Sequence, residues 1–245
     1  MLLVLPAMLL ASPAWSQVSA AKPESLMLDD ACTPQSASTY NPQTDWAWLC
    51  RYHAANLALP GGRADIVFIG DSITEGWGHF QPALFTGGIV NRGISGQTSP
   101  QLLVRFMADV VALKPRVVHL MIGTNDIAGN TGPTTPEAWK NNVRAMVELA
   151  RAHDIRVILG SIPPADHMSW RPDLRPAGQI AELNAWLKAF ATERGLVYAD
   201  YHAAMAGPAG EMRAEFTQDG VHPIAAGYAA MEPVTRAALA AALKD

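Results

Sequence analysis

Four short segments of the chain carry side chains that can act together on a carbonyl group. A serine hydroxyl is a weak nucleophile at neutral pH and needs a neighbouring base. Ser72 can supply the hydroxyl, His222 the base, and Asp219 the carboxylate that orients the imidazole. The predicted chemistry is acyl transfer from an ester through a covalent intermediate on Ser72. The segments are, in order, Gly70-Asp71-Ser72, Gly93-Ile94-Ser95-Gly96, Gly123-Thr124-Asn125-Asp126 and Asp219-Gly220-Val221-His222.

The middle two segments predict where the negative charge of the reaction would be held. Asn125 offers a side-chain amide that can donate a hydrogen bond to an oxyanion. Gly96 offers a backbone N–H with no side chain to block the approach of the carbonyl. The N–H of Ser72 itself would be the third donor. We therefore predict an oxyanion hole formed by Ser72, Gly96 and Asn125.

Each segment alone has a simpler interpretation. A serine after a strand commonly lies in a turn, paired glycines mark many tight turns, and Asp219 could cap the helix expected after His222. Three carboxylates, Asp71, Asp126 and Asp219, could also converge on Mg²⁺, but such a site would leave Ser72 and His222 without roles. The four segments in this order favour the catalytic interpretation, with Asp126 in a structural role. We expect no metal and no cofactor.

The remaining histidines do not compete for the role of base. His119 lies within an apolar strand and is expected to be a core residue. His153 is expected near the end of a helix. The others, which are His53, His79, His167 and His202, have no partners at metal-ligand spacing.

These side chains must be positioned by the elements around them, and the pattern from Ala64 onward alternates β-branched runs with longer amphipathic segments. The runs show little alternation, as expected for strands that are buried on both faces. The predicted strands are Ile66 to Ile69, Ile89 to Asn91, Val117 to Ile122, Val157 to Ile162 and Leu196 to Ala199.

The predicted helices begin with recognisable signals. Ser99 and Pro100 open the first, and Thr135 and Pro136 open the second. A third covers about Gly178 to Arg194, and the last runs from Pro223 to about Leu243.

This order predicts an α/β fold: a three-layer α/β/α sandwich with a flavodoxin-like, five-stranded parallel sheet. Ligands of such sheets lie beyond the carboxyl ends of the strands, and Ser72, Gly96 and Asn125 follow the first three strands. The segment from Pro163 to Pro176 follows the fourth. Three apolar residues near these ends, Trp77, Met168 and Trp170, are expected either to line the rim of the site or to pack over the core.

Composition excludes some functions. The chain of 245 residues has 18 Lys and Arg against 22 Asp and Glu, without a basic cluster. It therefore carries no electrostatic footprint for nucleic acid, and a small-molecule, carbohydrate or lipid ester is the expected partner. No later stretch is long enough to cross a membrane, so no stable membrane insertion is expected.

The first residues are almost wholly apolar and lead into small-x-small sites at Ala14 to Ser16 and Val18 to Ala20. We interpret residues 1–20 as a signal peptide and expect the protein to be periplasmic or secreted. The segment lacks a basic residue at its start, so a misplaced start codon or an ordinary apolar N-terminus is the alternative. Residues 21–61 form an N-terminal extension, and residues 62–245 the catalytic domain. If the protein is exported, Cys32 and Cys50 are expected to form a disulfide; in the cytosol they would be two thiols.

The four segments resemble the SGNH (GDSL-type) hydrolase superfamily in order and spacing, from about Ile66 to Leu243. Residues 91–98 and 122–126 look most like bacterial acylhydrolases related to lysophospholipase and platelet-activating-factor acetylhydrolase. The resemblance implies that Ser72, Gly96, Asn125 and His222 are the namesake residues and that Asp219 completes the triad. Ile73 stands where the family often has Leu. There is no GxSxG elbow of the α/β-hydrolase type.

The sequence thus predicts a secreted serine esterase. Short connections around the segments and the lack of a long lid favour an open cleft for short acyl groups, such as acetyl on a carbohydrate. Lysophospholipid or thioester hydrolysis is the alternative within the family. A carbohydrate- or lipid-binding protein without catalysis is the alternative from another class.

Overall fold

The computed structural model of the chain describes residues 31–244, so the predicted signal peptide lies outside the described residues. The strands are β1 (Ile66–Gly70), β2 (Ile89–Gly93), β3 (Val117–Met121), β4 (Arg156–Gly160) and β5 (Val197–Ala199). The helices are α2 (Pro34–Ser38), α3 (His53–Leu57), α4 (Ser72–Phe80), α5 (Ser99–Asp109), α6 (Thr124–Ala128), α7 (Pro136–Ala152), α8 (Ala177–Arg194), α9 (Tyr201–Met205) and α10 (Ala225–Ala242).

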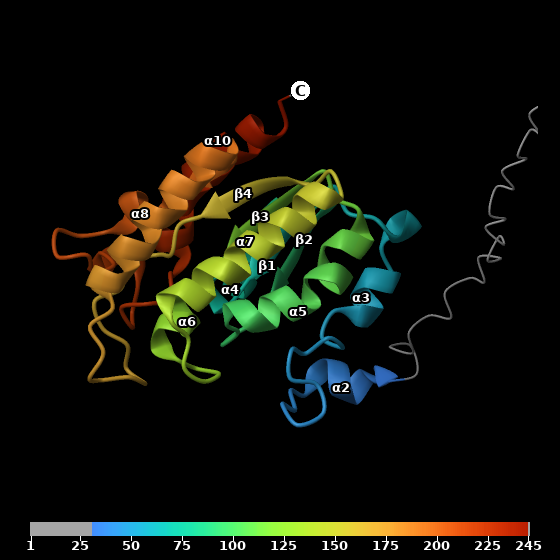
Figure 1. Cartoon of the computed structure of the whole chain (residues 1–245), viewed down its shortest axis with the longest axis horizontal. Helices are drawn as coiled ribbons and strands as arrows, with labels where there is room; N and C mark the ends of the chain where they lie inside the picture. The colour runs from blue at the N-terminus through green and yellow to red at the C-terminus, as the bar shows by residue number, and fades with distance from the viewer. Residues whose placement is uncertain (1–30, 245) are drawn as a thin grey trace, which may run out of the picture.

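The five strands form one parallel sheet in the order β2-β1-β3-β4-β5 (Figure 1). This is the doubly wound order of flavodoxin-like folds, and it confirms the predicted fold class. The order reverses between β1 and β3, the position where ligands of such sheets bind. Ser72 and Asn125 follow these two adjacent strands, and Gly96 follows β2 on the other side of β1.

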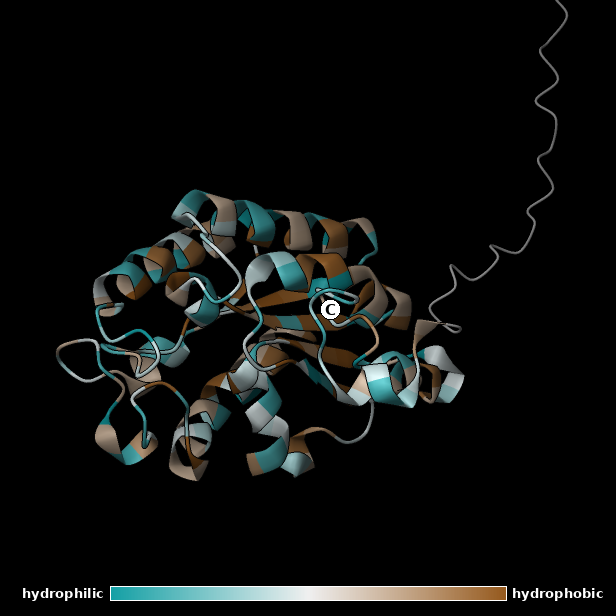
Figure 2. Cartoon of the chain, turned by 90° about the horizontal axis from the view of Figure 1, so that it is seen from below, coloured by the Kyte–Doolittle hydropathy of each residue, from teal (hydrophilic) through white to brown (hydrophobic). Residues whose placement is uncertain are grey.

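The sheet is buried on both faces because successive side chains of each strand point to opposite sides. Val67 and Ile69 of β1 belong to one apolar cluster, which α5, α7 and α8 complete. Ile66 and Phe68 belong to a second cluster with α4, α9 and α10. Figure 2 shows the apolar strands enclosed between the helices. A parallel sheet requires this double cover, which explains the near-continuous apolar runs.

Helix boundaries differ from the prediction at two places. Thr98, not Ser99, is the N-cap of α5, where it forms a capping box with Gln101. The last helix begins at Ala225, two residues after Pro223, and Ile224 is its N-cap. Thr135 is the N-cap of α7, and its side chain accepts a hydrogen bond from the N–H of Ala138.

Of the three apolar residues for which a place at the rim and a place in the core were both expected, two are core residues. Trp77 is fully buried and packs edge-to-face on Phe68. Met168 is 1% exposed and belongs to the cluster on the opposite face of the sheet. Neither side chain is therefore exposed to a ligand. Both are large and apolar, and such side chains are usually buried even when they lie near the ends of strands. Trp170 is 39% exposed.

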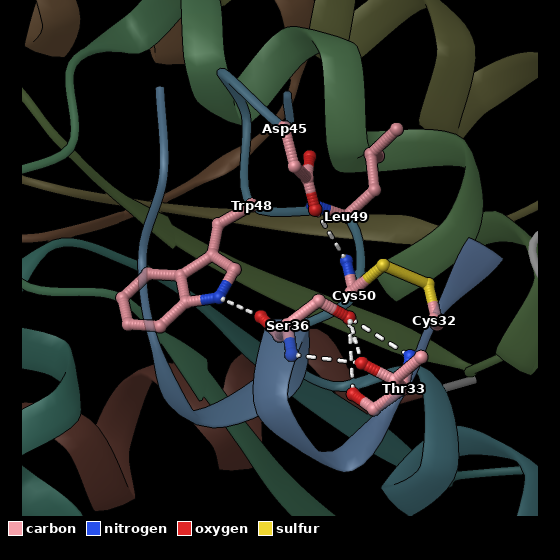
Figure 3. Close-up of a disulfide and its surroundings, with 7 residues drawn as sticks. All are labelled: Cys32, Thr33, Ser36, Asp45, Trp48, Leu49 and Cys50. Carbon is pink, nitrogen blue, oxygen red and sulfur yellow. Dashed lines mark hydrogen bonds between the residues drawn. A yellow bond between two sulfur atoms is a disulfide. The ribbon is translucent and has the colours of Figure 1, made fainter. Parts of the chain in front are cut away.

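The described part of the N-terminal extension is fixed by a disulfide between Cys32 and Cys50 (Figure 3). Between the cysteines, the Asp45 carboxylate accepts hydrogen bonds from the N–H groups of Leu49 and Cys50, at 2.8 and 2.9 Å. The Trp48 indole donates to the carbonyl of Ser36. The extension therefore has a defined conformation although it contains little regular structure.

Candidate active site

Ser72, His222 and Asp219 lie in one hydrogen-bonded line. The Ser72 Oγ is 3.0 Å from Nε2 of His222. On the other side of the ring, Nδ1 of His222 is 2.6 Å from Oδ2 of Asp219. The serine begins α4, and the other two residues lie in the loop before α10, where His222 is 150 positions away from Ser72 in the chain. The structure brings together the three residues that the sequence analysis selected, in the geometry of a nucleophile, a base and an orienting acid.

Asp219 is held as a carboxylate. Burial alone would raise its pKa, but hydrogen bonds from the backbone and ring of His222 and from the N–H of Val221 lower the pKa to about 2. The backbone donors bind Oδ1 and leave Oδ2 for the imidazole. Asp219 therefore orients His222 and does not cap α10, whose N-cap is Ile224.

The junction between β1 and α4 fixes the nucleophile. Asp71 is the N-cap of α4, and its Oδ1 accepts a hydrogen bond from the N–H of Ile73 at 3.0 Å. Gly70 is required because a Cβ at this position would lie 2.1 Å from Oγ1 of Thr74 and 2.4 Å from the carbonyl oxygen of Met121. Ser72 is thus the first helical residue, where its N–H has no acceptor within the helix.

The three predicted oxyanion donors are the N–H groups of Ser72 and Gly96 and the side-chain amide of Asn125. The backbone N–H groups of Ser72 and Gly96 have no hydrogen-bond partner among the described residues. Gly96 has φ +78°, a backbone conformation that a residue with a side chain rarely adopts. Asn125 donates from Nδ2 to the carbonyl of Gln97 at 3.1 Å and makes a longer contact of 3.4 Å with Asp71. A stronger acceptor such as an oxyanion could replace that longer contact.

Asn130 holds the Asn125 amide in this orientation, which the sequence analysis did not foresee. Nδ2 of Asn130 donates to Oδ1 of Asn125 at 2.6 Å. The Trp170 indole in turn donates to Oδ1 of Asn130 at 3.1 Å, and its ring centroid lies 6.2 Å from that of His222. Trp170 therefore lies at the rim of the site, beside the base. The sequence signal was weak, because Asn130 lies beyond the recognised segment in a Gly-Asn-Thr-Gly turn.

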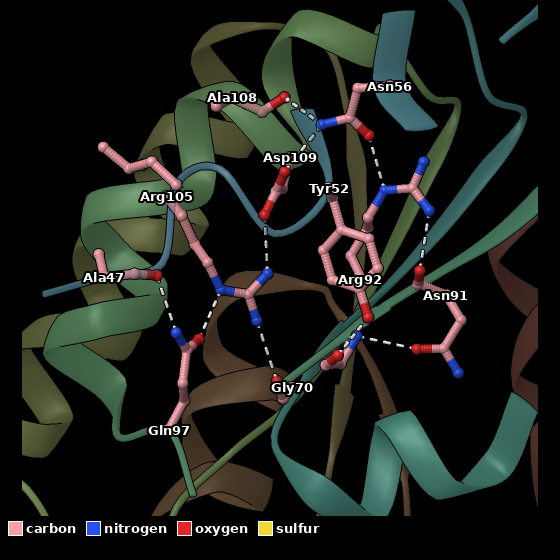
Figure 4. Close-up of polar contacts among 12 residues, drawn as sticks. Ala47, Tyr52, Asn56, Gly70, Asn91, Arg92, Gln97, Arg105, Ala108 and Asp109 are labelled. Atoms are coloured by element: carbon pink, nitrogen blue, oxygen red, sulfur yellow. Dashed lines mark hydrogen bonds and ion pairs between the residues drawn. The ribbon is translucent and has the colours of Figure 1, made fainter. Parts of the chain in front are cut away.

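A buried cation supports the loop that carries Gly96 (Figure 4). Arg105 of α5 has no exposed surface and pairs with Asp109 at 2.9 Å. Its guanidinium also donates to Oε1 of Gln97 at 2.6 Å and to the carbonyl of Gly70 at 3.0 Å. One side chain thus connects Gly70, the last residue of β1, with Gln97 in the loop that carries Gly96. A charged residue within the apolar face of the predicted helix was the signal that could have identified it.

Asp126 has the structural role expected of it. Its carboxylate accepts hydrogen bonds from the N–H of Ser99 at 3.0 Å and from the Ser99 hydroxyl at 2.6 Å. Burial raises the pKa of Asp126 to about 7 and that of Asp71 to about 6, against the opposing effect of their hydrogen bonds. His119 is fully buried, 2.8 Å from the hydroxyl of Tyr201, and burial lowers its pKa to about 3.

In residues 31–244 there is no group of three or more His, Cys, Asp or Glu side chains that could hold a metal ion. None of the described helices is long and apolar enough to span a membrane.

Residues 68–230 match the model of the GDSL-like lipase/acylhydrolase family. The chain belongs to this family. The match includes Ser72, Gly96, Asn125, Asp219 and His222, and the membership predicted from the four segments is confirmed. The family takes its name from lipases and acylhydrolases, which cleave carboxylic esters.

Solved structures and curated relatives agree with this membership. A structure from Bacteroides fragilis, described as an acylhydrolase, superposes with a TM-score of 0.78 at 42% identity, covering 82% of this chain and 99% of that one. A lipoprotein of Bacillus subtilis is 31% identical over 42% of this chain and 50% of its own length. An acetylxylan esterase of Geobacillus stearothermophilus is 39% identical over 27% of this chain and 42% of its own length. The chain thus spans half or less of these two curated relatives.

Proposed function

We propose that this GDSL-family protein is an exported serine esterase that hydrolyses short acyl esters, acetyl esters above all, through an acyl-enzyme on Ser72. The observation that carries the proposal is the 3.0 Å contact between Ser72 Oγ and His222 Nε2, with Asp219 on the other ring nitrogen. A serine that already touches an oriented imidazole can lose its proton as it attacks.

The reaction proceeds in two steps. Ser72 Oγ attacks the ester carbonyl carbon while its proton moves to Nε2 of His222, and the carbonyl oxygen becomes an oxyanion. The N–H groups of Ser72 and Gly96 and the amide of Asn125 bind this oxyanion. The C–O bond to the alcohol then breaks, and the alcohol leaves with the proton from His222. Water repeats the sequence on the acyl-enzyme and releases the acid.

The exposure of the residues around Ser72 supports short acyl groups. The side chains of Asp219 and His222 are each 42% exposed, so the catalytic line lies at an open surface instead of a deep tunnel. An open site gives a long acyl chain little apolar surface to bury, whereas an acetyl group needs little. The acetylxylan esterase among the relatives favours the same acyl group.

Export rests on independent support. The Cys32–Cys50 disulfide belongs to proteins of oxidising compartments, and one relative is a lipoprotein. The apolar residues 1–20 would serve as the signal peptide, with the protein active in the periplasm or outside the cell.

Hydrolysis of p-nitrophenyl esters from acetate to long chains, by the purified protein and its Ser72→Ala variant, tests this function. We expect the highest kcat/KM on acetate and a loss of several orders of magnitude in the variant. A long-chain optimum would instead favour a lysophospholipase. Equal activity in Ser72→Ala would exclude the mechanism, and no hydrolysis of any ester would favour a binding protein.

A further inference from the structure

A cavity of about 430 Å³ opens between the N-terminal extension and the oxyanion loop. Gly96 lies in its wall on the side of the catalytic domain, together with Asn130 and Thr131. The opposite wall comes from the extension, through Tyr40, Trp46 and Trp48. The volume is within the range of roughly 300 to 1,000 Å³ that is usual for small-molecule sites. Gly96 belongs to both the cavity and the proposed oxyanion hole, so the cavity borders the proposed reaction site at this residue.

The chemistry of the walls favours a sugar ring over an alkyl chain. Three aromatic side chains line one wall, and Tyr40 and Trp46 keep 39% and 40% of their surface exposed. Ile94 and Pro42 are the two aliphatic side chains of the lining. They offer too little apolar surface to bury a long acyl chain. A pyranose has flat C–H faces that pack on aromatic rings and hydroxyl groups that need hydrogen-bond partners. The indole N–H of Trp46 has no partner in the described structure and is available to a hydroxyl.

The aromatic wall is built in advance of any ligand. Gln101 of the catalytic domain donates from Nε2 to the Tyr40 hydroxyl at 3.0 Å and to the carbonyl of Trp46 at 2.7 Å. Gln97, next to Gly96, donates to the carbonyl of Ala47 at 2.8 Å. Two buried amide side chains therefore fix the extension against the loop that carries Gly96, and preorganisation of this kind lowers the entropic cost of binding.

One residue of the same wall, Trp48, has a strained backbone conformation. Trp48 has φ +52°, in the left-handed region that a bulky side chain rarely adopts. The surrounding contacts hold it there: its indole donates to Ser36, its ring packs 5.1 Å from that of Tyr40, and the disulfide closes the segment (Figure 3). Strain of this kind persists where the structure overdetermines a conformation, commonly at ligand sites.

We propose that this cavity binds a pyranose ring of the alcohol part of the ester, so that the protein deacylates acetylated saccharides. The proposal rests on the proposed esterase function, because it assigns the leaving group of that reaction. The N-terminal extension would then be a substrate-binding element in which Trp46 carries much of the selectivity.

The first test compares kcat/KM for acetylated methyl β-D-xylopyranoside and for ethyl acetate, with acid release measured by pH-stat. Trp46→Ala should lower kcat/KM for the sugar ester about tenfold, which is the contribution of one stacked ring, and leave kcat/KM for ethyl acetate unchanged. Trp46→Phe retains a ring and should recover most of the preference. Leu57 is an exposed residue of the same extension, so Leu57→Ala is the matched control and should change kcat/KM for neither substrate.

Other outcomes would overturn the proposal. Equal losses on both esters would assign Trp46 a structural role, and no loss on either would mean that the cavity is not used. A selective loss on p-nitrophenyl octanoate would assign the cavity to the acyl chain instead of the alcohol.

A binding measurement separates this proposal from the proposed function. Xylotriose is titrated into Ser72→Ala and into the Ser72→Ala/Trp46→Ala double variant, with isothermal titration calorimetry as the readout, because it does not depend on the tryptophan that is removed. Saturable binding in the first and its loss in the second would support the sugar cavity even if no ester were hydrolysed. The protein could instead hydrolyse simple acetates but neither bind xylotriose nor prefer the sugar ester. That result would overturn the proposal of a sugar-binding cavity and leave the proposed esterase function in place.

Discussion

Glu75 accepts two hydrogen bonds from Ser95, the residue immediately before Gly96. Oε2 of Glu75 accepts both, from the Ser95 N–H at 2.9 Å and from the Ser95 hydroxyl at 2.5 Å. Glu75 lies in the first turn of α4, which begins at Ser72, so it connects this helix to the loop that carries Gly96. Its other oxygen pairs with Arg51 of the N-terminal extension at 3.2 Å. One carboxylate thus joins the three segments that surround the proposed reaction.

Replacing Glu75 by Ala should lower kcat without a comparable change in KM. Glu75 does not touch the reacting atoms, and its loss would release the N–H of Gly96 from its position relative to Ser72. Displacements of this kind cost roughly tenfold to a hundredfold in rate. Glu75→Gln retains one acceptor oxygen and should recover part of the loss. A KM increase with unchanged kcat in steady-state kinetics on p-nitrophenyl acetate would assign Glu75 to binding instead.

Asn125→Ala should lower kcat by roughly a hundredfold to a thousandfold, the usual penalty for removing one oxyanion donor. The same variant leaves Ser72, His222 and Asp219 in place, so the acyl-enzyme should still form, more slowly. A pre-steady-state burst measured with p-nitrophenyl acetate checks this. Asn130→Ala offers a graded comparison, because it removes only the group that holds the Asn125 amide at 2.6 Å. A loss in Asn130→Ala larger than that in Asn125→Ala would contradict these roles.

The sequence predicted the sheet and the grouping of Ser72, His222 and Asp219 because their signals are local. β-branched runs mark the buried strands, and the proposed site residues follow the ends of these strands or lie three positions apart in one loop. Helix α4 was not foreseen, since Gly76 and Gly78 interrupt its periodicity and it holds its place by packing on β2. Arg105 was missed for another reason. Its partners Gln97 and Gly70 lie 8 and 35 positions away, and only the fold brings them together.

The three apolar residues whose place at the rim or in the core was left open illustrate the same limit. Trp77, Met168 and Trp170 all lie near strand ends in the sequence, and tertiary packing alone decides which of them reaches the surface. Trp77 is covered by α10 through Tyr228, whereas Trp170 lies in the loop after β4 beside His222.

Gly96→Ala should reduce both stability and activity, and Gly62→Ala separates the two effects. Gly96 and Gly62 have φ +78° and +65°, and neither has an atom within 4 Å of an added Cβ. Each substitution should cost about 1 to 2 kcal/mol of the free energy of unfolding, because a left-handed residue with a side chain is strained. Gly96→Ala should in addition lower kcat, since its methyl group would stand beside the oxyanion donor. Urea unfolding and p-nitrophenyl acetate hydrolysis are measured on both variants. Equal activity in the two would remove Gly96 from the oxyanion hole.

Asp126→Asn should change how stability depends on pH. The buried carboxyl has its pKa raised to about 7, against an ordinary value of about 3.9 in the unfolded chain. Between these values the folded state keeps a proton that the unfolded state has released. The contribution of Asp126 to stability is therefore fully present below about pH 4 and declines as the pH rises to about 7. Asparagine carries no titrating proton, so Asp126→Asn should lack this decline.

Urea unfolding at pH 4.5 and pH 7.5, on the wild type and on Asp126→Asn, measures the difference. The free energy of unfolding of the wild type should fall between the two pH values by more than that of the variant. The variant should keep a smaller decline from Asp71, whose pKa burial raises to about 6 in the same direction. Asp173→Asn, which alters an exposed carboxyl after β4, is the control and should follow the wild type. A parallel pH response in wild type and Asp126→Asn would mean that the folded protein binds no extra proton at Asp126, and the carboxylate beside Ser99 would then be ionised throughout this range.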